Sequence, residues 1–350
     1  MNAREPSIRL TQLAHGGGCG CKIAPGVLQQ ILGNATSLPV PAALLVGIET
    51  SDDAAVYRLD DDKAIVATTD FFTPVVDDPF DFGAIAATNA LSDVYAMGAT
   101  PLFALAIVGM PIATLPVDSI KRILDGGQSI CTRAGIPVAG GHTIDTAEPI
   151  YGLVGIGVVD PKRLKRNADA RAGDVIILGK PLGIGIYSAA LKRGLLDADS
   201  YRAMLDSTTR LNTPGIALST MPDVHAMTDV TGFGLAGHLL EMCRGANVGA
   251  EIEFARLPMQ PGALELAREG FVTGASTRNW NGYGESVSLG AAIGTVERAL
   301  LTDPQTSGGL LVACAPDAVR AVLETFEREG FGAATPIGRF VAGPARLNVT

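Results

Sequence analysis

The sequence predicts an α/β protein with two domains, on three observations. Its 350 residues are 47% apolar and 18% charged, which supplies enough apolar residues for a large buried core. Strand-like and helix-like hydrophobic patterns alternate in both halves of the chain. The 42 glycines and 21 prolines are spread without a period, which indicates many turns and argues against a collagen-like or disordered chain. We expect a mobile N-terminal segment at 1–43, a first domain at 44–160 and a second at 161–350, because basic residues after Pro161 are typical of a polar connector.

The charge and the cysteines narrow the possible partners. A net charge of −9 argues against nucleic acid or a membrane surface, because both bind basic patches. Any anionic ligand must therefore be held locally, by metal ions and backbone amides. Five cysteines without framework spacing, and an N-terminus without an apolar run, predict a reduced cytoplasmic protein without a signal peptide. The uncharged stretch 94–117 is long enough for a membrane span, but prolines interrupt it, so we expect no span and a short buried strand at 103–108.

Hydrophobic periodicity predicts the elements of the first half. We expect strands at 44–48, 64–69, 103–108, 137–139 and 151–159, and helices at 25–32, 82–97 and 117–133. Asp81 is the expected N-cap of the helix at 82–97. A loop at 140–143 would offer bare backbone amides to a phosphate, although His142 alone is more typical of a hydrogen-bonded loop residue than of a catalyst.

The second half repeats the alternation of strands and helices. We expect strands at 174–178, 224–227, 310–314 and 335–341, helices at 186–193 and 317–330, and helical regions that end near 211 and 245. Residues 277–280 should form a polar loop and residues 303–309 a tight turn. Glycines 232, 234 and 237 match a dinucleotide fingerprint formally. We reject this interpretation, because Asp229 lies just before them, where its charge would repel a pyrophosphate unless a metal ion intervened.

The segment from His15 to Lys22 carries two thiols and an ammonium on a backbone made almost wholly of glycine. Glycines allow a close approach of the backbone, and a lysine near a cysteine favours the thiolate. On spacing alone, three interpretations stay open: a loose tail, a half-built metal site, and a reactive site that contains Cys19 and Cys21.

Two pairs of polar residues, one after a predicted strand and one on a predicted helix, also indicate a functional site. Asp52 and Asp53 are adjacent after a predicted strand, and they repel each other unless a cation lies between them, although a solvated turn is the alternative. Asn89 and Asp93 are four residues apart, so they share one face of a helix with almost no other polar residue. This pair favours a functional site over a wet helix face.

Several segments together resemble the selenophosphate synthetase (selenide, water dikinase) family. They are 15–22, 49–56, 68–72, 87–93, 140–143, 228–234 and 303–309. The resemblance implies the two-domain fold of aminoimidazole ribonucleotide synthetase, with a homodimer in which two N-terminal sheets form a barrel. It also implies a reaction in which ATP, selenide and water give selenophosphate, AMP and phosphate, the selenium donor for selenoproteins and selenouridine.

The resemblance also implies roles for individual residues. Cys19 matches the reactive position and Lys22 the lysine needed for turnover, while Asp53, Asp93 and Asp229 match the Mg²⁺ ligands. The positions that match the ATP site are Lys22, Thr50, Ser51, Asp52, Asp70, Asp93, Gly141, His142 and Thr143. Mg²⁺ prefers oxygen ligands, and it would neutralise the phosphates in this acidic chain. The glycines before Lys22 would let the N-terminal segment close as a lid.

Two other classes of protein remain possible. Another ATP-dependent kinase or synthetase of the same fold, such as a thiamine-phosphate kinase, would share the aspartates but would not need Cys19 and Lys22. A non-enzymatic thiol or metal carrier would use His15, Cys19 and Cys21 as soft ligands and would not need the aspartates.

Overall fold

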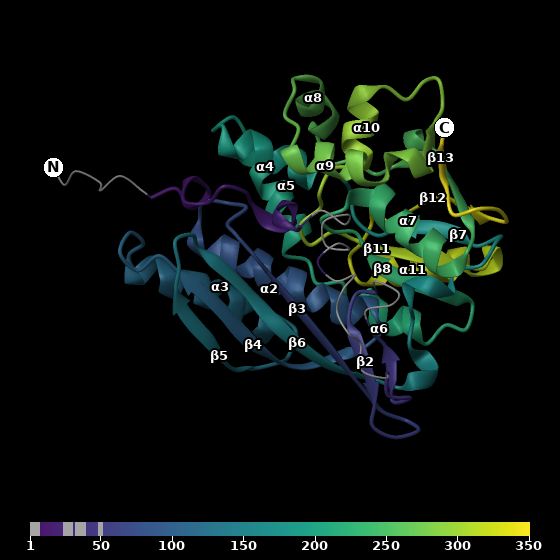
Figure 1. Cartoon of the computed structure of the whole chain (residues 1–350), viewed down its shortest axis with the longest axis horizontal. Coiled ribbons are helices and arrows are strands. Elements are labelled where there is room, and N and C mark those ends of the chain that lie inside the picture. Colours follow the sequence, from purple (N-terminus) through teal and green to yellow (C-terminus); the bar gives the residue numbers. More distant parts are fainter. Residues whose placement is uncertain (1–7, 24–30, 32–39, 48–51) are drawn as a thin grey trace.

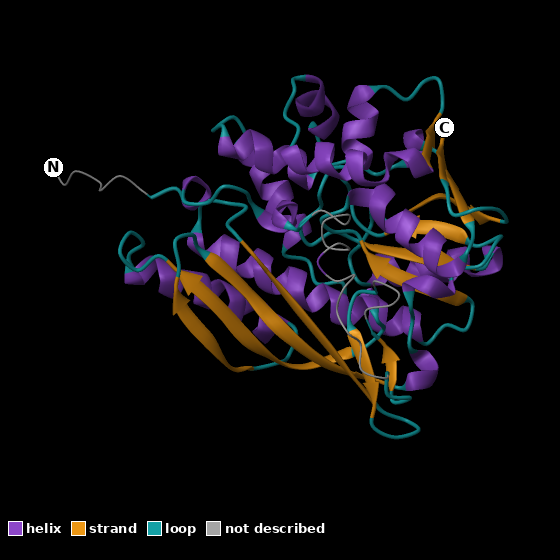
Figure 2. Ribbon diagram, viewed as in Figure 1, coloured by secondary structure: helices purple, strands orange, loops and turns teal. Residues whose placement is uncertain are grey.

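The computed structural model describes residues 8–23, 31, 40–47 and 52–350. It contains two β-sheets, each packed against helices, which confirms the predicted α/β fold (Figures 1 and 2). The predicted helix at 25–32 falls almost wholly outside the described residues. Within the described part of the chain, no helix is both long and apolar enough to cross a membrane.

The first sheet has six strands in the order β1-β2-β3-β6-β4-β5. Its strands are β1 (Leu44–Val46), β2 (Ala55–Arg58), β3 (Ala64–Phe72), β4 (Thr100–Met110), β5 (Val138–Asp145) and β6 (Ile150–Val159). Helices α2 (Pro79–Ala96) and α3 (Val117–Arg133) lie on one face of this sheet, and Figure 1 shows no described helix on the other face. The strands β3, β6 and β4 form its centre, and β5 is an edge strand that pairs with β4 alone among the described residues.

The second sheet has seven strands in the order β10-β13-β9-β12-β7-β11-β8. Its strands are β7 (Val175–Leu178), β8 (Val224–Asp229), β9 (Gly249–Ile252), β10 (Val287–Leu289), β11 (Leu310–Cys314), β12 (Thr335–Val341) and β13 (Leu347–Val349). The helices of this half are α4 (Ile184–Lys192), α5 (Ala198–Thr208), α6 (Pro214–Ser219), α7 (Gly234–Ala246), α8 (Ala263–Arg268), α9 (Gly274–Tyr283), α10 (Thr295–Leu301) and α11 (Val319–Arg328). Short 3-10 turns are η1 (Leu10–Gln12), η2 (Gly18–Cys21), η3 (Pro161–Arg163), η4 (Asn167–Asp169), η5 (Phe254–Arg256), η6 (Gly284–Ser286) and η7 (Pro316–Ala318).

Helix α2 is the central element of the molecule. Every residue from Phe82 to Ala96 is buried, because the helix packs on the first sheet on one side and touches β8, α5 and α6 of the second half on the other. Its N-cap is Asp78, which accepts hydrogen bonds from the backbone N–H groups of Phe80 and Asp81, so the prediction of Asp81 as the cap was wrong. Proline at the first helical position, Pro79, fixes the start two residues before the expected cap.

Three segments differ from the sequence predictions. Asp70 lies inside β3, which continues to Phe72 rather than ending at 69. The predicted loop at 140–143 belongs to strand β5, where an added Cβ at Gly141 would come 2.1 Å from the carbonyl oxygen of Ala106 on β4. Glycine there serves the close approach of two strands rather than a turn. The predicted polar loop at 277–280 lies in helix α9.

Candidate active site

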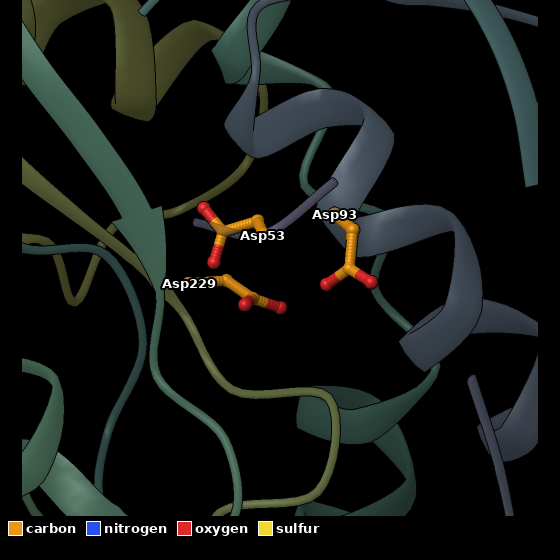
Figure 3. A group of neighbouring side chains, drawn as sticks. All are labelled: Asp53, Asp93 and Asp229. Atoms are coloured by element: carbon orange, nitrogen blue, oxygen red, sulfur yellow. The ribbon is translucent and has the colours of Figure 1, made fainter. Parts of the chain in front are cut away.

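Three aspartates from three different elements meet at the junction of the two halves. Asp53 lies just before β2, Asp93 on α2 and Asp229 at the end of β8 (Figure 3). One carboxylate oxygen of each lies within 4.8 Å of the others, and within the described residues no other three His, Cys, Asp or Glu side chains converge in this way. Thr228 Oγ1 donates a hydrogen bond to Asp53 Oδ1 at 2.7 Å, and Thr68 Oγ1 donates to Asp93 Oδ2 at 2.5 Å. The fold therefore brings together the three residues that the sequence predicted as metal ligands.

The electrostatics of this triad favour a bound cation. Burial raises the pKa of Asp53, Asp93 and Asp229, and for Asp53 and Asp93 the nearby carboxylates raise it further. Asp53 Oδ2 and Asp229 Oδ2 are buried and have no hydrogen-bond partner among the described residues. Such oxygens are costly to bury without a partner. Mg²⁺ binds oxygens at about 2.1 Å, so two oxygens on one ion lie at most about 4.2 Å apart, and three oxygens within 4.8 Å of one another need only small movements to share an ion.

The Gly-rich segment is docked on both halves of the molecule. In η2, the Gly18 N–H donates to the Thr73 carbonyl oxygen at 2.9 Å, and the Cys19 N–H donates to Thr306 Oγ1 at 3.2 Å. Gly18 has a φ of 55°, and a Cβ there would meet Thr306 Oγ1 at 2.3 Å. Cys19 is only 1% exposed. The segment 15–22 is therefore not a loose tail in this structure.

Asn89 connects Cys19 to the neighbouring groups. Its Oδ1 accepts hydrogen bonds from Cys19 Sγ at 3.1 Å and from the Ser307 N–H at 2.7 Å. Its Nδ2 donates to Asp70 Oδ2 at 2.5 Å. Asp70 in turn forms an ion pair with Lys22, with 3.6 Å between Lys22 Nζ and Asp70 Oδ1. One buried amide thus holds the thiol, a carboxylate and a backbone group of the second half in fixed positions.

The structure reverses the sequence prediction for the charge of Cys19. Burial raises the pKa of its thiol far above the ordinary value, and the lowering effect of Lys22 is smaller. The hydrogen bond to Asn89 Oδ1 also requires the thiol to carry its proton, because a carbonyl oxygen can only accept. The negative charge of Asp70 raises the pKa of Lys22, so the ammonium stays charged. The prediction that Lys22 gives Cys19 thiolate character is therefore wrong for this docked arrangement.

A buried lysine supports the turn that holds Cys19. Lys180 is 2% exposed, and its Nζ donates to the backbone oxygens of Ser307 at 2.9 Å and Arg210 at 2.7 Å. Ser307 has a φ of 52°, which a non-glycine residue adopts only when its surroundings hold it there. Burial lowers the pKa of Lys180 to about 7. The sequence predicts no role for Lys180, because nothing in its local pattern separates it from core residues, and Thr228 enters the prediction only as part of the segment 228–234.

The comparisons with known proteins identify the family of this chain. Residues 51–159 match the family described as "AIR synthase related protein, N-terminal domain", and residues 171–349 match the family described as "AIR synthase related protein, C-terminal domain". A protein of Paraburkholderia xenovorans (strain LB400) named selenide, water dikinase is 63% identical over 343 residues, which cover 98% of this chain and 97% of the relative. The chain belongs to the selenide, water dikinase family. A relative of the same name from Rhizobium meliloti (strain 1021) is 54% identical over 349 residues, with 100% and 99% of the two chains covered.

Solved structures share the fold of this selenide, water dikinase family member at low sequence identity. Thiamine-monophosphate kinase from Stenotrophomonas maltophilia K279a has a TM-score of 0.63 at 22% identity, covering 94% of this chain and 96% of its own. The hydrogenase maturation protein HypE, solved in complex with ATP, has a TM-score of 0.65 at 16% identity, covering 98% and 94%. These structures confirm the predicted aminoimidazole ribonucleotide synthetase type of fold.

Some residues that the family resemblance implied for ATP lie around one cavity. A cavity of about 340 Å³ is lined by Lys22, Asp70 and Phe72, together with Cys21 and Ile150. Its volume is in the range of small-ligand pockets. Cys21 is half-buried, and its Sγ lies 2.9 Å from Thr73 Oγ1.

Asp52 lies beside the aspartate triad, next to Asp53 in the chain. Its Oδ1 accepts from the backbone N–H groups of Asp53 at 3.1 Å and Asn167 at 3.3 Å. Burial raises the pKa of Asp52 to about 6. Thr50 and Ser51, which the resemblance also assigned to ATP, fall outside the described residues.

The segment Gly141-His142-Thr143 is not brought to this cavity. These residues are exposed on the edge strand β5, and β6 and β4 separate β5 from β3, which carries Asp70. Three strand spacings amount to about 14 Å. His15 also lies apart from the thiols, since its ring bonds Glu148 at 2.8 Å and its side chain is 78% exposed. His15, Cys19 and Cys21 therefore do not form the metal site of a carrier in this arrangement.

Proposed function

We propose that this protein catalyses the reaction of its family, in which ATP, selenide and water give selenophosphate, AMP and phosphate. The observation that carries the proposal is the convergence of the carboxylates of Asp53, Asp93 and Asp229 next to the docked Cys19–Lys22 turn. A thiamine-phosphate kinase of the same fold would need the carboxylates alone. The turn adds a buried thiol and a charged lysine, which suit a soft nucleophile beside a polyphosphate.

Magnesium is the ion that fits the three aspartates best. Asp53, Asp93 and Asp229 would hold it through carboxylate oxygens, two of which have no other partner among the described residues. Bound there, Mg²⁺ would neutralise charge on the phosphates of ATP. Thr228 and Thr68 orient two of the carboxylates by donating hydrogen bonds to them. Such supporting contacts hold ligand oxygens in place before the ion arrives.

The other groups of the site position ATP and the selenium atom. The cavity beside Asp70 has the volume of a small-ligand pocket, and Lys22 lies in its wall with its side chain 39% exposed, so its ammonium can reach a phosphate. Cys19 is the proposed contact for selenium. Because its thiol is protonated and donates to Asn89, it must release that hydrogen bond before it can act as a thiolate. Opening of the glycines at 16–18 would allow this exchange and would admit the substrates.

We further propose that the protein works as a homodimer. Most side chains of β3, β6 and β4 that point away from α2 and α3 are apolar, and several of them are only partly buried, including Ile65, Val154, Ile156, Phe103 and Leu105. A second copy would cover this face. Pairing along β5 would also bring Gly141, His142 and Thr143 to the partner's nucleotide, which gives these predicted ATP residues a role that one copy does not provide. The cytoplasmic location stays a prediction.

Phosphorus NMR under anaerobic conditions tests the proposed reaction. The purified protein is incubated with ATP and Mg²⁺, with and without selenide, and with thiamine phosphate in place of selenide. We expect selenophosphate and AMP only when selenide is present. Phosphorylation of thiamine phosphate without any selenophosphate would favour the kinase alternative, and no conversion of ATP under either condition would contradict both.

A further inference from the structure

A buried asparagine connects helix α2 to the turn at 303–309, next to the aspartate triad. Asn212 lies between α5 and α6 and is 1% exposed. Its Nδ2 donates to Ser92 Oγ at 2.6 Å and to the Gly308 carbonyl oxygen at 2.9 Å. Ser92 is also 1% exposed, and it directly precedes the triad residue Asp93 on α2. Asn212 therefore belongs to the immediate surroundings of the three aspartates.

The contact to Gly308 fixes which way the amide of Asn212 faces. A backbone carbonyl oxygen can only accept a hydrogen bond, so the atom that faces it must be the NH2 group. The second hydrogen of this group goes to Ser92 Oγ. Because an amide NH2 group only donates, Ser92 is the acceptor in this contact, and its own hydroxyl hydrogen must go to another group.

The hydroxyl hydrogen of Ser92 goes to Asp229. Burial raises the pKa of Asp229, and a hydrogen bond from the Ser92 side chain lowers it. Each carboxylate of the triad thus accepts from one hydroxyl group: Asp53 from Thr228, Asp93 from Thr68 and Asp229 from Ser92. Asp229 Oδ2 has no hydrogen-bond partner within the part of the chain that the structure describes, so it is available to an ion.

The stability of the fold alone does not explain an asparagine at position 212. Its Oδ1 is buried and has no hydrogen-bond partner among the described residues. A buried acceptor without a partner costs free energy, and a leucine, which has the same branching, would not carry that oxygen. What asparagine provides and leucine lacks is the donor group that faces Ser92 and Gly308.

We propose that Asn212 is a positioning residue for the metal ligand Asp229 and that it acts through the hydroxyl group of Ser92. The inference rests on the Mg²⁺ site of the proposed function and adds two residues to it. Asn212 occupies the oxygen of Ser92 and so keeps the hydroxyl hydrogen on the carboxylate of Asp229. The carboxylate then has one orientation, with one oxygen available, before the ion arrives.

Calorimetry of ATP binding at a series of free Mg²⁺ concentrations tests this role. The proteins compared are the wild type, Ser92→Ala, Asn212→Leu and the double variant. Each single variant should need about tenfold more Mg²⁺ for half-maximal ATP binding, the effect of losing a contact that supports a metal ligand. The double variant should need no more Mg²⁺ than the single variants, because both changes remove the same hydrogen bond to Asp229. ATP affinity at saturating Mg²⁺ should stay close to that of the wild type.

Ser276→Ala is the matched control. Ser276 is 3% exposed on α9, and its hydroxyl group bonds the Ala299 carbonyl oxygen and Thr302 Oγ1 rather than an aspartate. Its replacement removes a buried serine and should leave the Mg²⁺ requirement unchanged. Thermal unfolding shows whether each variant is folded, and Asn212→Ala takes the place of Asn212→Leu if the leucine does not fit.

Three results would overturn the inference. One is an unchanged Mg²⁺ requirement in a folded Asn212 variant. Another is a raised requirement in Asn212→Leu but not in Ser92→Ala, which would mean that Asn212 acts through Gly308 and the turn. The third is a double variant whose loss is the product of the two single losses, which would mean that the residues act independently. Failure of the proposed function is a separate result, since a wild type that binds ATP with Mg²⁺ but makes no selenophosphate would remove the reaction and keep this inference.

Discussion

Replacing Asp229 by asparagine should make the ligand-free protein more stable and the ligand-bound protein less stable than the wild type. Asparagine keeps the shape of the side chain and removes one of three carboxylates whose oxygens lie within 4.8 Å of one another. Two unit charges at that distance repel by about 3 kcal/mol at an effective dielectric constant of 20. Protonation of one carboxylate limits this cost, so the expected gain in unfolding free energy is about 1–3 kcal/mol.

The sign of the pH dependence follows from the raised pKa values. The folded protein holds protons on these aspartates that the unfolded chain has already released, so repulsion in the folded state grows as pH rises above the ordinary carboxyl pKa. The gain in unfolding free energy from Asp229→Asn should therefore be larger at pH 8 than at pH 5. With Mg²⁺ and ATP at about 100 times Kd, the wild type should gain about 2.7 kcal/mol, and the variant should gain almost nothing.

Urea unfolding measures all four states, with chelator or with Mg²⁺ and ATP, for both proteins. Asp223→Asn is the matched control, because Asp223 is exposed just before β8 and its change should have little effect in either condition. The reasoning fails if Asp229→Asn destabilises the ligand-free protein, or if the variant keeps the full stabilisation by Mg²⁺ and ATP.

Three further predictions concern other parts of the molecule. Cys19→Ser should abolish selenophosphate formation in phosphorus NMR while thermal unfolding and ATP binding stay close to wild type, and Cys21→Ser should be milder; equal losses would indicate a joint role for the two thiols. In the wild type, the unfolding free energy should rise by about 1.5 kcal/mol between pH 7 and 8.5, because over this range Lys180 is protonated in the unfolded chain but largely neutral in the folded protein, where its pKa is about 7. Lys180→Met should remove this rise. Urea unfolding that gives the same pH slope for the variant and the wild type would refute the prediction. Ile156→Glu, on the uncovered face of the first sheet, should give a monomeric mass in light scattering, and a wild type that is itself monomeric would contradict the dimer.

The strongly periodic elements could be predicted from the sequence. Helix α3 has the predicted bounds, because its apolar residues recur at helical spacing beside a charged face. Strand β6 agrees to within one residue for a similar reason, as an apolar run between turns. The three aspartates were assigned through the family resemblance, and their convergence depends on how α2 and β8 pack, which no local pattern specifies.

Other features could not be predicted because tertiary contacts override local signals. Gly140 and Gly141 are typical of a turn, yet both lie in β5, and at Gly141 the close approach to β4 requires glycine. The polar residues around Arg278 indicate a loop, yet they lie on α9, where Asn279 is buried and bonds two backbone oxygens. The charge of Cys19 was also misjudged, because burial outweighs a neighbouring lysine and cannot be read from spacing.

The central position of α2 limits which halves of related proteins can be combined in one chain. The helix carries Asn89 and Asp93 and belongs to the first half, yet it also forms part of the interface with β8, α5 and α6 of the second half. An added Cβ at Gly215 on α6 would lie 2.0 Å from the Tyr95 carbonyl oxygen, so no side chain larger than that of glycine fits at this contact between α6 and α2. A chimera joining the first half of one relative to the second half of another should therefore fold only when α2, α6 and β8 are compatible. Recombination within the family is constrained at this seam, even though each half has its own sheet.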